Sequence, residues 1–195
     1  MKFSSNNFYH VFNRGNNKQN IFPRSPNYDF FKLKIKKLIS PHCDLVAYCL
    51  MPNHFHILLY INERDVTFLP NGKMQVLERQ IGTLQSSYSR AINIQEKKTG
   101  SLFQAKCKVI ELRDRHPFTA FHYIHQNPIK AGLSKKMDDW KYSSYGEYSL
   151  GLDGICNKNL AYTLLGIPSD KSLFDKQSHS VIAYEHPNEN SRQTT

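Results

Sequence analysis

The chain has 195 residues, and 26 Lys or Arg against 16 Asp or Glu give it a formal net charge of +10 with neutral histidines. This length fits one domain with a tail, and the charge favours a polyanionic partner, with nucleic acid ahead of a membrane surface. No apolar run reaches the roughly 18 residues of a membrane-spanning helix, and the N-terminal residues lack the features of a secretory signal. We therefore expect a cytoplasmic protein without a membrane partner.

The hydrophobic pattern predicts seven elements along the chain. They are a strand at 8–13, a basic helix at 27–39, a strand at 43–51, a strand at 54–61, a helix at 75–97, a strand at 101–112 and a helix at 118–127. Pro52-Asn53 joins the second and third strands in an antiparallel hairpin, and Asn127-Pro128 closes the last helix. This order is that of an α+β, ferredoxin-like split βαβ sandwich, which predicts an antiparallel sheet with helices on one side and a helix appended.

The composition changes only near the C-terminus. We assign residues 1–148 to one domain and residues 149–195 to a C-terminal extension, a helical tail with one short apolar run at 159–167 and a disordered end. The four cysteines, at 43, 49, 107 and 156, form no CxxC pair, so neither a disulfide framework nor a cysteine zinc site is predicted.

Two histidines stand on the strand "HFHILLYI". In a strand, His54 and His56 point to the same face about 7 Å apart at their bases, while Phe55 points to the core. This spacing leaves two readings open, a bidentate metal clamp or a solvated sheet face.

The helix after Pro117 offers a further ligand. Tyr123 and Asn127 are four residues apart and share a helical face, with Gln126 beside them. Taken singly, Tyr123 also fits a packing tyrosine, because the chain has 11 tyrosines, and Asn127 also fits a residue that ends a helix before proline.

Five ordered motifs resemble the single-tyrosine HUH transposases, in particular the REP-associated tyrosine transposases of bacteria. They are "YHVFNRGNN", "YCLMPNHFHILLY", "GSLFQAKCK", "YIHQNPIKAGL" and "DDWKYSSYGEY", which together cover about residues 8–148. About 70 residues follow Tyr123, which favours the REP-associated type and a monomer over the shorter insertion-sequence members, which form dimers.

The resemblance implies roles for the matching residues. His54 and His56 would be the HUH pair, Tyr123 the nucleophile, and Asn127 the third ligand of a Mg²⁺ or Mn²⁺ ion, with Gln126 the weaker candidate. The implied activity is that of a DNA transposase, a single-strand endonuclease and strand-transferase that cleaves hairpin-associated single-stranded DNA through a 5′-phosphotyrosine intermediate.

Basic residues near these motifs are candidate DNA contacts. They are Arg14, Lys106, Lys108 and Lys130, for each of which a solvated basic face is the other reading.

No general base is assigned, because His122 and His125 project away from the Tyr123 face of the helix. Tyr88 is a rival nucleophile on the apolar stripe of its own helix and is interpreted as core.

Two further functions compete with strand transfer. A zinc hydrolase would use His54 and His56, but no third histidine or acid stands at a fixed spacing from them. The other is a non-catalytic DNA or RNA hairpin binder that retains the fold.

Overall fold

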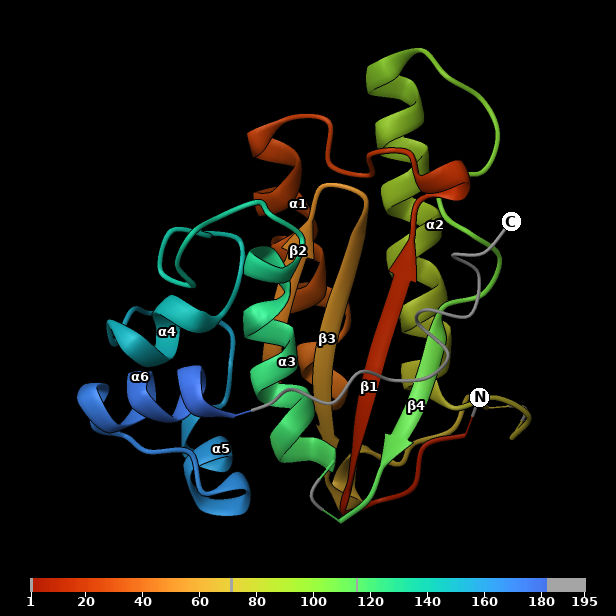
Figure 1. The fold of residues 1–195 in the computed structure, drawn as a ribbon. Helices are drawn as coiled ribbons and strands as arrows, with labels where there is room; N and C mark the ends of the chain where they lie inside the picture. The colour runs from red at the N-terminus through yellow and green to blue at the C-terminus, as the bar shows by residue number, and fades with distance from the viewer. Residues whose placement is uncertain (1, 71, 115, 182–195) are drawn as a thin grey trace, which may run out of the picture.

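A four-stranded antiparallel sheet forms the centre of the computed structural model, which describes residues 2–70, 72–114 and 116–181 (Figure 1). The strands follow the order β2-β3-β1-β4, and β1 pairs with both β3 and β4. The strands and the first three helices are β1 (Asn7–Arg14), α1 (Ser25–Leu38), β2 (Asp44–Met51), β3 (His54–Ile61), α2 (Val76–Glu96), β4 (Lys108–Leu112) and α3 (His116–Lys130). This is the predicted split βαβ order, so the predicted fold class is confirmed.

Helices α1 and α2 cover one face of the sheet, and they lie behind it in Figure 1. The buried residues of α2 recur every three or four positions, which gives the helix one apolar stripe: Leu77, Ile81, Leu84, Tyr88 and Ile92. Alternate strand residues meet this stripe, and on β3 these include Phe55 and Ile57. The interpretation of Phe55 and Tyr88 as core residues is therefore confirmed.

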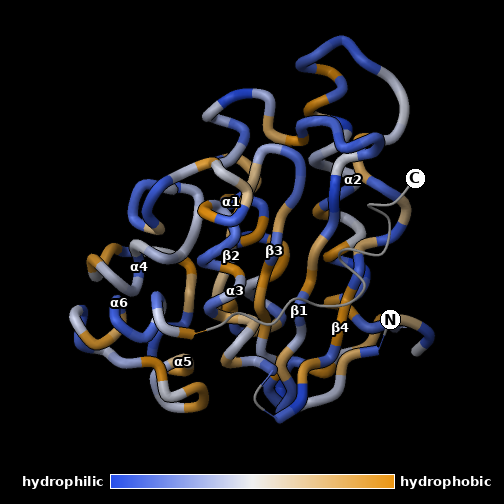
Figure 2. The backbone as a smooth tube through the Cα atoms, in the orientation of Figure 1, coloured by the Kyte–Doolittle hydropathy of each residue, from blue (hydrophilic) through white to orange (hydrophobic). Residues whose placement is uncertain are grey.

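The opposite face carries α3, so the expectation of helices on one side holds for α1 and α2 but is wrong for α3. Helix α3 buries Ala120, Phe121 and Ile124 against residues of β2 and β3 such as Cys49 and Leu58. Strand β2 is apolar at successive positions and buried from Leu45 to Met51, so both of its faces need a cover. Figure 2 shows these hydrophobic stretches along the strands, with mostly hydrophilic loops beyond the end of β1.

Two predicted boundaries differ from the structure. Helix α3 continues through Pro128 and ends at Lys130, and Gly132 in the turn that follows has a φ of +68°, which suits the end of a helix. The strand predicted at 101–112 is ordered as β4 only from Lys108, since the preceding residues form loops around the buried Phe103.

The C-terminal extension lies beside α3 (Figure 1). It contains α5 (Lys158–Leu165) and α6 (Lys171–Ser180), preceded by the short α4 (Tyr145–Ser149). Phe174 of α6 is fully buried in the same apolar cluster as Phe121. The division after residue 148 stays a prediction, and the predicted disorder at residues 185–195 lies outside the described part.

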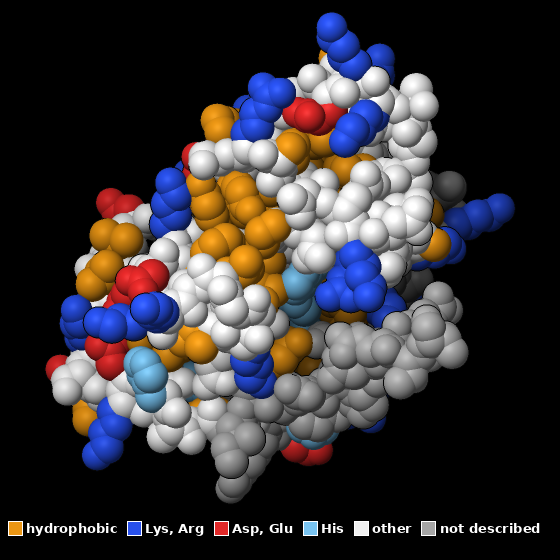
Figure 3. All heavy atoms as spheres, turned by 45° about the horizontal axis from the view of Figure 1, so that its top comes forward, with side chains coloured by type: hydrophobic (Ala, Val, Ile, Leu, Met, Phe, Trp, Pro, Cys, Tyr) orange, Lys and Arg blue, Asp and Glu red, His pale blue; other side chains and the backbone are white. Residues whose placement is uncertain are grey.

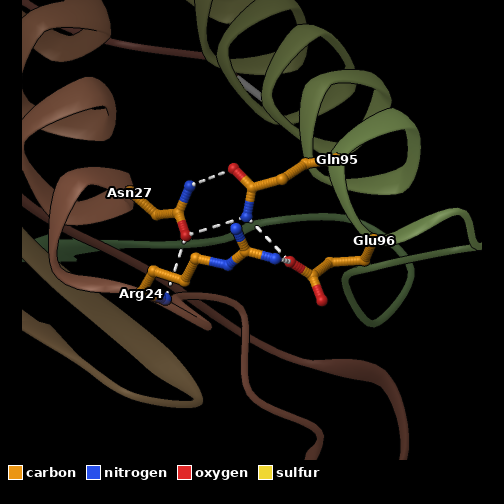
Figure 4. A network of polar contacts seen from close by, with 4 residues as sticks. All are labelled: Arg24, Asn27, Gln95 and Glu96. Atoms are coloured by element: carbon orange, nitrogen blue, oxygen red, sulfur yellow. Dashed lines mark hydrogen bonds and ion pairs between the residues drawn. The ribbon is translucent and has the colours of Figure 1, made fainter.

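A polar network ties the start of α1 to the end of α2 (Figure 4). The side chain of Asn27 donates to Gln95 Oε1 over 2.9 Å and accepts from the backbone N–H of Arg24 over 3.0 Å. The Arg24 guanidinium lies 3.2 Å from the Glu96 carboxylate. These contacts fix the angle between the two helices on this face.

Within the described ranges, no helix is both long and apolar enough to cross a membrane.

Candidate active site on the α3 face of the sheet

His54 and His56 lie on the face of β3 that α3 covers. Their ring centroids are 5.1 Å apart, and the rings are nearly perpendicular. His56 is 4% exposed, whereas His54, at the first position of the strand, is half-buried. The alternation of the strand therefore directs both imidazoles to the layer that contains the tyrosine helix.

Tyr123 lies beside His56 of this pair. Its ring centroid is 5.7 Å from that of His56 and 6.3 Å from that of His10. Tyr123 is half-buried, while its neighbours His122 and Ile124 are fully buried. The structure thus brings together the predicted nucleophile and the predicted histidine pair, which are 67 residues apart between His56 and Tyr123.

Asn127 lies one turn after Tyr123 and is 7% exposed. Its Nδ2 donates to the Tyr123 carbonyl oxygen over 3.1 Å, which leaves Oδ1 as the amide atom of ligand type. Gln126 is directed elsewhere, since its Nε2 donates to the carbonyl oxygens of Ser178 and Val181 beside α6. The preference for Asn127 over Gln126 agrees with these contacts, although the ligand role itself stays a prediction.

A third histidine, to which the sequence motifs assign no role, completes the cluster. His10 of β1 is 3% exposed, and its Nε2 lies 2.9 Å from Nδ1 of His56. The two ring planes are inclined by 27° and their centroids are 5.1 Å apart, so the rings meet edge to edge through these nitrogens. The available signal was the alternation of "FYHVF", which places His10 on one strand face with Phe8 and Phe12.

Burial and positive charge keep the histidine pair neutral. Burial, together with the smaller effect of the neighbouring Arg14, lowers the pKa of His54 from 6.5 to about 4. Burial also lowers the pKa of His56 well below its usual value, with smaller contributions from His10, His54 and Arg14. Metal ligation requires neutral imidazole, so both rings have the protonation state of a ligand.

Hydrogen bonds at Nδ1 indicate which ring atoms suit a metal. The Nδ1 of His54 lies 2.5 Å from Oδ1 of Asn53, which can only accept, so the neutral ring carries its hydrogen on Nδ1 and its lone pair on Nε2. The Nδ1 of His56 is engaged with His10.

In the described part of the chain no group of three or more His, Cys, Asp or Glu side chains is arranged to hold a metal. The predicted set instead joins two imidazoles to one amide oxygen, a mixed set that fits Mg²⁺ or Mn²⁺.

The predicted DNA contacts differ in position. Arg14 pairs with His54 across β1 and β3, the Nζ of Lys108 lies 5.6 Å from the Phe12 ring centroid, and the Nζ of Lys130 lies 5.2 Å from the Tyr123 ring centroid. Lys106 is exposed in the loop before β4, so its predicted place in a strand is wrong. Figure 3 shows a histidine surface near the centre of the view with Lys or Arg side chains beside it. Three of the four predicted DNA contacts, Arg14, Lys108 and Lys130, therefore place positive charge next to the histidine and tyrosine cluster.

The histidines that flank Tyr123 pack within the protein. His122 and His125 are both fully buried, and the Nε2 of His125 lies 2.7 Å from the Ser144 hydroxyl. The Tyr88 hydroxyl donates to the Ile21 carbonyl over 2.8 Å on the other face of the sheet. The interpretation of all three as packing residues is confirmed.

Comparisons with known proteins agree with the observed fold. No family model matches the chain. A protein from Haemophilus influenzae described as a putative REP-associated tyrosine transposase is 25% identical over 112 residues, which are 52% of this chain and 58% of the relative. A solved REP-associated tyrosine transposase bound to a REP hairpin shares the fold, with a TM-score of 0.60 and 16% identity over 80% of this chain and 86% of that one.

The resemblance to the REP-associated tyrosine transposases is confirmed. The match to the Haemophilus relative spans less than two thirds of that protein's length. The likeness to the solved REP-associated tyrosine transposase extends over most of both chains. The fold shared with that structure is therefore not limited to the residues around the histidine pair.

Proposed function

We propose that this chain is a metal-dependent DNA transposase that nicks and rejoins single-stranded DNA next to a hairpin. The observation that carries the proposal is the position of the Tyr123 ring, 5.7 Å from His56 on the sheet face that His54 shares. The likeness to REP-associated tyrosine transposases, one of them solved with a REP hairpin, supports hairpin DNA as the partner. The chain would act as a monomer.

Tyr123 is the nucleophile of the proposed reaction. Its hydroxyl oxygen attacks the scissile phosphorus, the new O–P bond forms as the bond to the 3′ oxygen breaks, and the tyrosine proton leaves. The products are a 5′-phosphotyrosine link and a DNA strand whose 3′ oxygen has gained a proton. A tyrosine hydroxyl has a pKa of about 10 and attacks poorly at neutral pH, so the phosphate needs activation.

The residues around Tyr123 position and neutralise the phosphate. His54, His56 and Asn127 would hold Mg²⁺ or Mn²⁺, which when bound would offset the charge that develops on the non-bridging oxygens. Arg14 lies next to His54 and Lys130 lies next to Tyr123, so there is positive charge beside both the predicted ligand and the predicted nucleophile. These cations favour the DNA backbone without reading its sequence.

Strand transfer follows from the reversibility of this step. The phosphotyrosine link retains the phosphodiester bond energy, so a 3′ hydroxyl of the same or another strand can attack it and release Tyr123. The protein needs no nucleoside triphosphate for cutting or rejoining.

A covalent capture experiment tests the proposal. The protein is incubated with Mn²⁺ and a pool of DNA hairpins with randomised single-stranded flanks, labelled at the 3′ or the 5′ end, and separated on a denaturing gel. The 3′ label should migrate with the protein and the 5′ label should remain on free DNA. Tyr123→Phe should reduce the adduct by at least about 1,000-fold, because no other group replaces the nucleophile.

Tyr60→Phe is the matched control. Tyr60 lies on the same face of β3 and is also half-buried, so its removal should leave the adduct at the wild-type level. An adduct that persists in Tyr123→Phe would show that the nucleophile is assigned wrongly. Hairpin binding by the wild type without any adduct would favour the non-catalytic hairpin binder.

A further inference from the structure

We propose that His10 is a positioning residue that fixes the tautomer and the orientation of the His56 ring, an inference that rests on the proposed function. The Nε2 of His10 and the Nδ1 of His56 are 2.9 Å apart. A hydrogen bond between two nitrogens needs one donor and one acceptor, so only two arrangements of the neutral pair are possible.

The two arrangements differ in their consequence for His56. When His10 donates, the neutral His56 ring carries its hydrogen on Nε2 and has no lone pair there for a metal. When His56 donates from Nδ1, its lone pair is on Nε2, as the Asn53 contact makes it on His54. Only the second arrangement gives both histidines the same ligand atom, and it requires His10 to accept through Nε2.

The packing around His10 fixes the position of its ring relative to His56. The ring of Phe12 lies 4.8 Å from the ring of His10 and 5.6 Å from that of His56, and the two histidine rings are inclined by only 27°. His10 and His56 are diagonal neighbours on adjacent strands, because His10 pairs with Leu58 and His56 pairs with Phe12. The hydrogen bond therefore depends on the register of β1 and β3 rather than on a mobile loop.

A role in packing alone does not account for an imidazole at this position. His10 stands between Phe8 and Phe12 on its strand face, and all three side chains are buried. An aromatic hydrocarbon at position 10 would fill the same layer without the cost of burying two ring nitrogens. A hydrogen-bond acceptor directed at His56 gives the imidazole a purpose that phenylalanine cannot serve.

Metal affinity measured without DNA tests the inference. Free Mn²⁺ is followed by its electron paramagnetic resonance signal as the full-length protein is added. His10→Phe, which cannot accept the hydrogen bond, should weaken Mn²⁺ binding by about 10- to 100-fold. His10→Gln places an amide oxygen near the position of Nε2 and should stay within about threefold of wild type, whereas His10→Asn, whose amide is shorter, should resemble His10→Phe.

The tautomer is read directly in the metal-free protein. Imidazole ¹⁵N spectra should show the wild-type His56 protonated at Nδ1, and this should shift towards the Nε2-protonated form in His10→Phe or His10→Asn. Thermal unfolding of each variant verifies that it is folded. If His10→Phe does not fold, the comparison of His10→Asn with His10→Gln carries the test.

The outcomes separate this inference from the function on which it rests. His56→Ala should abolish Mn²⁺ binding, and if the wild type binds no Mn²⁺ or His56→Ala binds normally, the metal site and the inference both fail. If His56→Ala loses binding while folded His10 variants keep the wild-type affinity and tautomer, only the role of His10 is overturned. Equal weakening in His10→Gln and His10→Asn would also overturn it, because the acceptor would then make no difference.

Discussion

His122 stands next to the proposed nucleophile but faces the interior, between α3 and the extension. Its ring lies 4.8 Å from that of Phe118. Burial lowers the pKa of His122 from 6.5 to about 4, and the neighbouring Gln177 side chain opposes this shift. The residue is therefore neutral in the folded protein over a pH range in which it is protonated in the unfolded chain.

Acid should destabilise the protein through His122. Because the folded pKa is the lower one, the unfolded chain binds more protons between pH 6.5 and pH 4, so the free energy of unfolding falls as the pH decreases through this window. Between pH 7.5 and pH 5 the loss from this residue is about 2 kcal/mol. Urea unfolding at both pH values should show a pH dependence smaller by this amount in His122→Leu.

Phe118→Leu is the control for packing in this experiment. It changes a ring in contact with His122 without removing a titrating group, so it should lower the free energy of unfolding by equal amounts at both pH values. A pH dependence in His122→Leu that equals that of the wild type would contradict the assignment.

Individual residues show how far the sequence specifies the site. Strand periodicity places His54 and His56 on one face, and helix periodicity does the same for Tyr123 and Asn127. The order of the sequence motifs then predicts that the two pairs form one site. His10 could not be predicted as a site residue, because a lone histidine in an apolar strand has no distinctive spacing. Its partner, His56, is 46 residues away, and only the pairing of β1 with β3 brings them together.

At the level of the elements, α1 and α2 are coupled by buried amides rather than by their exposed charges. Asn27 is 5% exposed and holds both the Arg24 backbone and Gln95, whereas the Arg24 side chain is 63% exposed. We expect Asn27→Ala to lower the free energy of unfolding by about 1–3 kcal/mol, because its partners lose buried hydrogen bonds.

Arg24→Ala gives the comparison for the same network. It removes only the exposed ion pair with Glu96 and should cost less than about 1 kcal/mol. Both values come from urea unfolding, and equal costs for the two variants would show that the amide network does not couple the helices.

The elements themselves were predicted closely where periodicity is strong. The strand at 54–61 has the observed bounds of β3, and the helix at 75–97 differs from α2 by one residue at each end. The predictions failed at Pro128, whose local preference is outweighed by the burial of α3 on the sheet, and in the loop before β4. The face on which α3 lies was also mistaken, since element order alone does not determine it.

For the whole molecule, the C-terminal extension is part of the hydrophobic interior. Phe174 is fully buried against Tyr145 and Tyr148, with ring centroids 5.2 and 5.7 Å away. Phe174→Ala should therefore cost about 3–5 kcal/mol of the free energy of unfolding in a single cooperative transition.

Leu173 provides the adjacent control because it is 58% exposed on the same helix. Leu173→Ala should change the free energy of unfolding by less than about 0.5 kcal/mol. The same experiment tests the division after residue 148, since an extension that folds separately would unfold in its own transition and leave the main transition of Phe174→Ala unchanged.

The burial on both sides of Tyr123 has a consequence for the lifetime of a broken strand. With His122 and Ile124 fully buried and Tyr123 half-buried between them, the backbone that carries the hydroxyl is fixed to the sheet. In the proposed reaction, a DNA end joined to this oxygen stays within the reach of one side chain. The interval between cleavage and resealing would then depend on how soon an attacking 3′ hydroxyl arrives, so the geometry of the DNA, rather than a helix motion, would decide which ends are joined.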